Sequence, residues 1–168
     1  MRWLVDGYNV IRCAPALVAR EQESLQAGRE ALCRLLAAAA RASGDEFTVV
    51  FDGTRWGGTA FRTGRVRLLF SKAPERADHL LARLATAGTA VVSNDSEVRR
   101  SATRTGAIAI TADEFVARLL APSVPEKDED EDEPLPRPKK GNPRRPPKKA
   151  RAAARALRRL DRSTKRSS

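Results

Sequence analysis

The opening stretch M-R-W-L-V-D-G-Y-N-V-I, residues 1–11, is the part of the sequence that decides the fold. An apolar run from Trp3 to Val5 suits a buried strand, and a carboxylate, Asp6, follows it directly. Gly7 then lets the backbone turn sharply where the strand stops. The pattern predicts an acid at the rim of a sheet, where open α/β folds bind metals and phosphates. An isolated Asp-Gly pair is more often a simple turn, so the acid acquires meaning only from the rest of the chain.

Strand-like and helix-like stretches alternate after this opening. We expect strands at 3–5, 47–51, 66–70, 89–92 and 107–110, and helices at 21–42, 74–86, 94–105 and 111–120. An irregular segment is expected at 12–20, broken at Pro15, and a Gly- and Arg-rich loop at 54–64. Asn94 with Glu97, and Thr111 with Glu114, have the spacing of capping boxes. The alternation predicts an α/β domain with a mostly parallel central sheet.

The composition changes sharply near Pro122. The predicted organisation is a domain at 1–121, an acidic and then Pro/Lys/Arg-rich disordered linker at 122–149, and a basic, helix-forming tail at 150–168. The formal net charge is +11, of which residues 1–122 carry +4 and residues 123–168 carry +7. So basic a chain points to a polyanionic partner.

Few other classes of protein fit the composition. The two cysteines, Cys13 and Cys33, show no C-x-x-C spacing, which argues against a zinc site or a disulfide scaffold. No apolar run approaches the length of a membrane span, and no signal peptide pattern opens the chain. We therefore expect a cytoplasmic protein without a membrane partner.

Acidic residues recur at the carboxyl ends of the expected strands. Four of them follow strands and one lies near the start of a helix: Asp6, Asp52, Asp95, Asp113 and Asp78. In a parallel sheet these positions share one edge, so several carboxylates are expected to converge there. Converging carboxylates raise one another's pKa, and a hard divalent cation such as Mg²⁺ or Mn²⁺ relieves that repulsion.

Each of these acids except Asp78 also has a simpler explanation. Asp52 precedes a glycine and suits a turn, whereas Asp95 and Asp113 suit the first turn of a helix, where acids are common without any catalysis. The only histidine, His79, has no evident nucleophile beside it, so no Ser-His-Asp arrangement competes with the carboxylates.

Four segments resemble the YacP-like branch of the NYN domain family, a group of PIN-like bacterial ribonucleases. They are D-G-Y-N-V-I at 6–11, V-V-F-D-G at 49–53, E-R-A-D at 75–78 and V-V-S-N-D at 91–95. The resemblance covers about residues 1–121 and implies a PIN-like, Rossmann-like three-layer fold. It also implies a metal-dependent endoribonuclease in which Asp6, Asp78 and Asp95 are the catalytic and metal-binding acids and Asn9 steadies a ligand or a water.

The resemblance further implies an RNA substrate, single-stranded or messenger RNA, and a ribosomal context, with no preference for DNA. Many relatives carry a second acid directly after the helix aspartate, where this chain has His79. If that acid is a ligand, the affinity for metal is in doubt. The chain then becomes an inactive RNA- or ribosome-binding module with the same fold.

Basic residues interleaved with aromatics give the candidate RNA surface. The residues concerned are Arg55, Trp56, Phe61, Arg62, Arg65 and Arg67, with Arg99 and Arg100 on the helix after Asp95. The alternatives are a loop whose aromatics tuck into the domain and a solvated helix face. The basic tail suits sequence-independent RNA binding or a solubilising arm. A phosphatase or nucleotide-binding protein is disfavoured because neither a P-loop nor a G-x-G-x-x-G motif follows the first strand.

Overall fold

A six-stranded sheet forms the centre of the computed structural model, which describes residues 1–53, 61–121 and 147–160. The strands are β1 (Arg2–Asp6), β2 (Glu46–Phe51), β3 (Phe61–Thr63), β4 (Val66–Phe70), β5 (Thr89–Val92) and β6 (Ile108–Ile110). Their order is β3-β4-β2-β1-β5-β6, and only β3 runs antiparallel to its neighbour. The central position of β1 confirms that the opening stretch organises the sheet.

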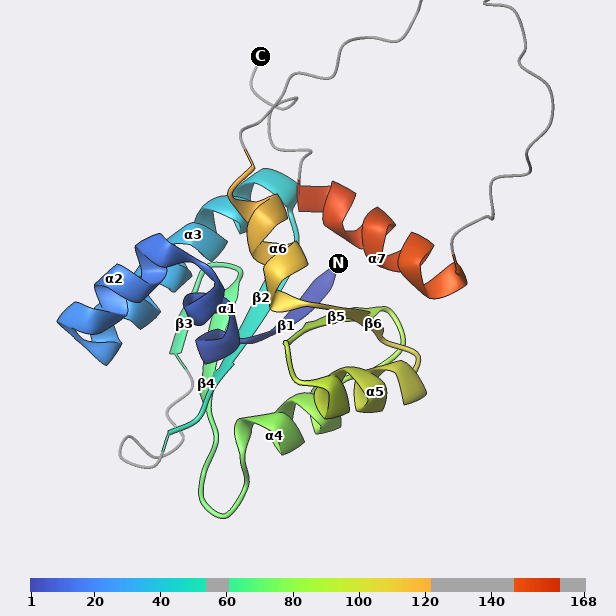
Figure 1. Ribbon diagram of the computed structural model, residues 1–168, viewed down its shortest axis with the longest axis horizontal. Helices are drawn as coiled ribbons and strands as arrows, with labels where there is room; N and C mark the ends of the chain where they lie inside the picture. Colours follow the sequence, from blue (N-terminus) through green and yellow to red (C-terminus); the bar gives the residue numbers. More distant parts are fainter. Residues whose placement is uncertain (54–60, 122–146, 161–168) are drawn as a thin grey trace, which may run out of the picture.

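Helices cover both faces of this sheet (Figure 1). One face carries α1 (Gly7–Cys13), α2 (Pro15–Glu23), α3 (Leu25–Ser43), α6 (Ala112–Leu119) and α7 (Lys148–Leu157), and the other carries α4 (Ala77–Leu84) and α5 (Ser96–Arg104). Successive residues of β1 alternate between them, with Trp3 and Val5 on the first face and Leu4 on the second. The predicted three-layer α/β fold with a mostly parallel sheet is confirmed.

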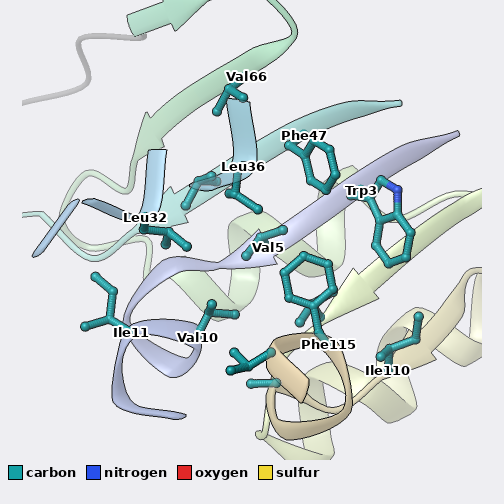
Figure 2. Packing of buried hydrophobic residues seen from close by; sticks show 14 of the residues in the cluster. Trp3, Val5, Val10, Ile11, Leu32, Leu36, Phe47, Val66, Ile110 and Phe115 are labelled. Carbon is teal, nitrogen blue, oxygen red and sulfur yellow. The ribbon is translucent and has the colours of Figure 1, made fainter. Parts of the chain in front are cut away.

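Three aromatic side chains lie together among aliphatic ones in the core on the larger side of the sheet (Figure 2). The Trp3 ring stacks on Phe47 of β2 at a centroid distance of 5.9 Å and lies 5.4 Å from Phe115 of α6. All three side chains are fully buried. Because each of these rings comes from a different element, their packing fixes β1, β2 and α6 together.

The segment after the opening strand differs from the expected one. Residues 12–20 are mostly helical, because Pro15 begins α2, a position that proline's fixed φ favours. The long helix expected from 21 is interrupted at Ser24, whose hydroxyl accepts a hydrogen bond from the Ala27 amide at 3.0 Å and begins α3. A Cβ at Gly28 would lie 2.9 Å from the Glu21 Cβ, so this glycine permits the close packing of α2 on α3.

Two further expectations are corrected near the site. The helix expected from Pro74 begins only at Ala77, and the Ala73–Pro74 peptide bond is cis. Residues 61–63, expected in a loop, form β3, which pairs with β4. Gly44 ends α3 in the left-handed conformation with φ 73°, as predicted.

Part of the C-terminal tail packs on the domain. Helix α7 lies against β6, and Ala156 and Leu160 are 2% and 8% exposed within the larger core. Arg159 reaches the fully buried Asp45 at 2.8 Å. The core therefore receives residues from beyond 121, where the sequence placed the end of the domain. The prediction of a disordered linker falls mostly on residues 122–146, outside the described part of the chain, as do residues 161–168 of the tail.

Candidate active site

Asp6 ends β1 and caps α1 at the carboxyl edge of the sheet. Its side chain is 5% exposed, and Oδ1 accepts a hydrogen bond from the Asn9 amide at 3.2 Å. Oδ2 accepts two more, from Asn9 Nδ2 at 2.5 Å and from Ser93 Oγ at 3.1 Å. Burial raises the pKa of Asp6, these hydrogen bonds oppose the rise, and the charge of Asp78 adds to it. Asp6 is thus an acid held rigidly by neutral donors in surroundings that disfavour its charge.

Gly7 is required by the packing of the strand end. A Cβ at this position would lie 2.2 Å from Cε1 of Phe51, the last residue of β2. No real Cβ contact is so short, so a larger residue would displace either the ring or the backbone beside Asp6. The sequence attributed this glycine to a sharp turn, whereas its role is to let the first turn of α1 approach the ring.

Asp78 lies in the first turn of α4 and is half-buried. Burial raises its pKa, and the charges of Asp95 and then Asp52 raise it further, against the lowering effects of Arg76 and His79. The charge of Asp78 also raises the pKa of Asp6, so Asp78 is the acid that interacts with each of the other three. Asp6, Asp52 and Asp95 therefore each lie close enough to Asp78 for the charges to interact.

Ser93 joins Asp6 to Asp95, a role that the sequence analysis did not assign to it. Its side chain is fully buried, and its hydroxyl donates to Asp6 and accepts from the Asp95 amide at 3.1 Å. Its position at the end of β5, inside the segment V-V-S-N-D, was the available signal. One hydroxyl thereby sets the spacing between two of the candidate acids.

Asp95, not Asn94, caps α5. Asp95 Oδ1 accepts hydrogen bonds from the amides of Glu97 at 2.6 Å and Val98 at 3.2 Å. The expected Asn94–Glu97 capping box is therefore wrong, because Asn94 turns to the next helix. It donates to Asp113 Oδ2 at 2.8 Å and accepts from the Ala112 amide at 2.8 Å.

The remaining candidate acids have structural contacts. Asp52 Oδ1 accepts from Ser71 Oγ at 2.9 Å and from the Ala77 amide at 2.7 Å, and so fixes the start of α4 next to Asp78. Asp113 is exposed in the first turn of α6 and bound to Asn94. The predicted capping box of that helix, between Thr111 and Glu114, is confirmed. Asp52 therefore positions Asp78, while Asp113 contacts Asn94 and Cys13.

Carboxylate oxygens are the ligands that Mg²⁺ and Mn²⁺ prefer, so the donor chemistry of this edge fits such a cation. Within the described residues, however, no three Asp, Glu, His or Cys side chains are close enough to coordinate one ion together. Both oxygens of Asp6 also accept hydrogen bonds already. Mg²⁺ is commonly held by one or two carboxylates with waters completing its shell, and this set suits binding of that kind.

The candidate RNA-binding residues fall into three groups. Arg55 and Trp56 lie outside the described residues, as does the side chain of Phe61. Arg62, Arg65 and Arg67 are exposed on the β3–β4 hairpin, and the pairing of Arg62 with Arg67 places both on one face. On α5, Arg99 donates to the Ser93 carbonyl at 2.9 Å and Arg100 to the Ser96 carbonyl at 3.3 Å. Arg99 thus supports the loop from Ser93 to Asp95, and the arginines of the hairpin are exposed to solvent.

A mostly parallel α/β sheet with acids at its carboxyl edge agrees with the PIN-like, nuclease-type fold that the motifs predict. The chain belongs to the YacP-like NYN domain family, whose family model matches residues 3–163. This match extends through α7, beyond the 1–121 expected from the motifs.

Solved structures agree with this assignment. The crystal structure of a tryptophan-to-leucine mutant of Rae1 (YacP) from Bacillus subtilis is similar with a TM-score of 0.60 at 26% identity, over 71% of this chain and 74% of that one. The crystal structure of Rae1 itself is similar with a TM-score of 0.53 at 26% identity, over 71% and 73%. No curated protein matches the chain.

Proposed function

We propose that this protein is an endoribonuclease that hydrolyses RNA phosphodiester bonds at the carboxyl edge of its sheet. The proposal rests on two pairs of acids at this edge: the charge of Asp78 raises the pKa of Asp6, and the charge of Asp95 raises the pKa of Asp78. Membership of the YacP-like NYN family supports this reading of the acids as nuclease residues. No described helix is long and apolar enough to cross a membrane. We place the activity in the cytoplasm, where messenger RNA is found.

The proposed roles follow from burial and contacts. Asp78 is half-buried and its pKa is raised, so it is the acid to which we assign proton transfer. Hydrogen bonds from Asn9 and Ser93 fix the orientation of the Asp6 carboxylate, so Asp6 positions a ligand that binds beside it. Asp95 is held as the cap of α5 and adds negative charge facing Asp78.

A divalent cation, Mg²⁺ or Mn²⁺, is proposed as the cofactor of this group. One or two of Asp6, Asp78 and Asp95 would hold it directly and the rest through waters, because a cation relieves the repulsion between carboxylates. When bound, such an ion activates water and stabilises negative charge on a phosphodiester. The protein's own contribution is to keep the carboxylates in place through Ser93, Asn9 and Asp52.

Cleavage of a 5′-labelled single-stranded RNA tests the proposal directly. Wild type, Asp6→Asn and Asp78→Asn are compared in MgCl₂, in MnCl₂ and in EDTA. We expect losses of about 10²–10⁴-fold in rate for both variants, because each removes a proposed catalytic group. Asp113→Asn is the matched control, since Asp113 is an exposed acid bonded to Asn94 and its charge is not among those that shift the pKa of Asp6 or Asp78, and its rate should equal that of wild type.

The substrate is tested in the same design by replacing naked RNA with translating ribosomes and mapping new RNA 5′ ends. Ends that appear only on ribosomes would assign messenger RNA in a ribosomal context as the substrate. If wild type, purified free of other nucleases, cuts neither substrate with either metal, the proposal of an enzyme fails.

One observation favours a second candidate, an inactive RNA- or ribosome-binding module. His79, at the place of the second acid expected from the family resemblance, is exposed beside Asp78, and its charge slightly opposes the rise in the pKa of that acid. Loss of an acid there would leave too few ligands for a metal. For this candidate, RNA binding is unchanged in Asp6→Asn, and His79→Asp introduces metal-dependent cleavage that wild type lacks.

A further inference from the structure

An arginine of α3, Arg29, lies in a cage of aromatic rings that the sequence did not reveal. Its guanidinium carbon is 5.5 Å from the centroid of Tyr8, 5.4 Å from that of Phe51 and 5.3 Å from that of Phe70. Nε and Nη2 both donate to the Tyr8 hydroxyl, Nε at 3.1 Å. The side chain is half-buried, so the cage fixes the guanidinium without sealing it from solvent.

The cage stands at the same edge of the sheet as the acids. Phe51 and Phe70 are the last residues of β2 and β4 and are paired in register, and Tyr8 follows two residues after Asp6. The Phe51 ring that contacts the guanidinium also packs against Gly7. Arg29 is therefore placed by the same residues that place the strand-end acid.

The Arg29 guanidinium has N–H donors that no residue in the described part of the chain uses. Of its five N–H groups, two are used by the Tyr8 hydroxyl. Within the described residues Arg29 has no ion pair and no further hydrogen bond, unlike Arg83 with Glu75 or Arg159 with Asp45. A guanidinium that is held among aromatic rings and has no carboxylate partner in the described residues is pre-organised to bind an anion in a fork geometry.

We infer that Arg29 is a phosphate-binding site for the RNA strand, beside the acids at the carboxyl edge. The inference rests on the proposed function, because an edge carrying four carboxylates repels a polyanion unless a fixed cation offsets them. A phosphate group is the ligand that fits, since it offers two oxygens to the remaining N–H groups and recurs along any RNA. Contact with the backbone predicts binding without sequence preference.

The test measures affinity, and so does not depend on cleavage. Binding of a fluorescein-labelled single-stranded RNA of mixed sequence is followed by anisotropy in EDTA at several salt concentrations. We expect Arg29→Met to weaken binding about tenfold and to reduce the slope of log K against log salt by about 0.7, the value for one phosphate contact on a single strand. Arg29→Lys keeps the charge but loses the fork, so its slope should stay near that of wild type while its affinity falls.

Arg41→Met is the matched control, because Arg41 is an exposed arginine in the last turn of the same helix, at its opposite end. Its affinity should stay within twofold of wild type, with an unchanged slope. Thermal unfolding shows whether each variant is folded at the assay temperature. If Arg29→Met is not, Tyr8→Phe decides, since it keeps the ring and removes the hydroxyl that orients the fork, and it should weaken binding severalfold.

The outcomes separate the two proposals. Wild type that binds RNA but cuts none refutes the enzyme and leaves the Arg29 site to be judged by affinity alone. Folded Arg29→Met that binds with the affinity and salt slope of wild type refutes the phosphate site, as does wild type that binds no RNA. A loss of affinity equal to that caused by Arg41→Met would mean that Arg29 contributes only to the general positive charge of the protein.

Discussion

Substitution of Asp45 provides the sharpest test of how the C-terminal tail is joined to the domain. This acid begins the segment leading to β2, is fully buried, and accepts hydrogen bonds from three directions. The donors are the Met1 amino group at 2.5 Å, Trp3 Nε1 at 3.0 Å and Arg159 at 2.8 Å. One carboxylate therefore connects the opening strand, β2 and a residue just beyond α7.

The expected loss can be worked from these contacts. Asp45→Ala leaves the indole N–H of Trp3 without an acceptor in the core and breaks a buried ion pair, a change that costs about 3–5 kcal/mol. The Arg159 side chain is 45% exposed, so its ion pair adds little to that sum. Asp45→Asn keeps an oxygen for Trp3 and loses the charge, so we expect about half the effect, about 2 kcal/mol.

The pH dependence has a definite sign. Burial opposes the charge of Asp45, but the hydrogen bonds from Arg159, the Met1 amino group and Trp3 outweigh it, and the net effect lowers the pKa of Asp45. Since the pKa in the unfolded chain is about 3.9, the stabilisation is complete above about pH 4 and is lost as the pH falls through the lower folded value. The stability difference between wild type and Asp45→Asn should therefore be constant at neutral pH and shrink in acid.

Urea unfolding followed by far-ultraviolet circular dichroism and tryptophan fluorescence measures these free energies. Glu46→Gln is the matched control, because Glu46 is the adjacent acid, is exposed and lies 4.0 Å from its nearest cation, Arg65. It should change the free energy of unfolding by less than about 0.5 kcal/mol. An Asp45→Ala variant as stable as Glu46→Gln would refute the anchoring role and, with it, the docking of α7 through Asp45.

Three further predictions concern single residues. Gly7→Ala should destabilise the fold by about 1–3 kcal/mol in urea unfolding, because its Cβ would overlap the Phe51 ring, and a loss below about 0.5 kcal/mol would contradict that packing. Asp78→Asn should raise the unfolding temperature by about 2–4 °C at pH 7. It removes an acid whose folded pKa is raised, so the gain should disappear as the pH falls below that value, and a gain that persists in acid would exclude charge as its cause. Burial and the charge of Glu30 raise the pKa of Cys33 to about 11, so iodoacetamide should label it slowly at pH 8 and faster toward pH 11, and rapid labelling at pH 8, read by mass spectrometry, would contradict this.

The strands and the acids at their ends were predictable from sequence because they depend on local patterns. An apolar run followed by an acid and glycine recurs at Asp6 and Asp52, and parallel pairing alone then places both at one edge. The start of α3 was missed for an equally local reason. Ser24 caps a new helix within a stretch whose composition favours one continuous helix.

Contacts between residues that are distant in the chain could not be predicted from the sequence. Asp45 follows Gly44 and looks like a turn acid, yet its partner Arg159 lies 114 residues away. Arg29 looks like a solvated residue of a helix, because nothing local shows that Phe51 and Phe70 end paired strands beneath it. Ser93 stood within a quoted motif, but its bond to Asp6 depends on how β5 lies beside β1.

Asp6 and Asp45 are the two buried aspartates in the described part of the chain, and their different partners suggest a functional role for the first and a structural role for the second. Both accept three or more hydrogen bonds, but Asp45 is paired with cations and its pKa is lowered, so its charge stabilises the fold. Asp6 receives only neutral donors in the described part of the chain, and burial with the charge of Asp78 raises its pKa. An uncharged serine or asparagine would cap α1 without that penalty. An acid kept where its own fold disfavours its charge is explained by a ligand that needs the charge, and we propose that this ligand is a divalent cation with a phosphodiester.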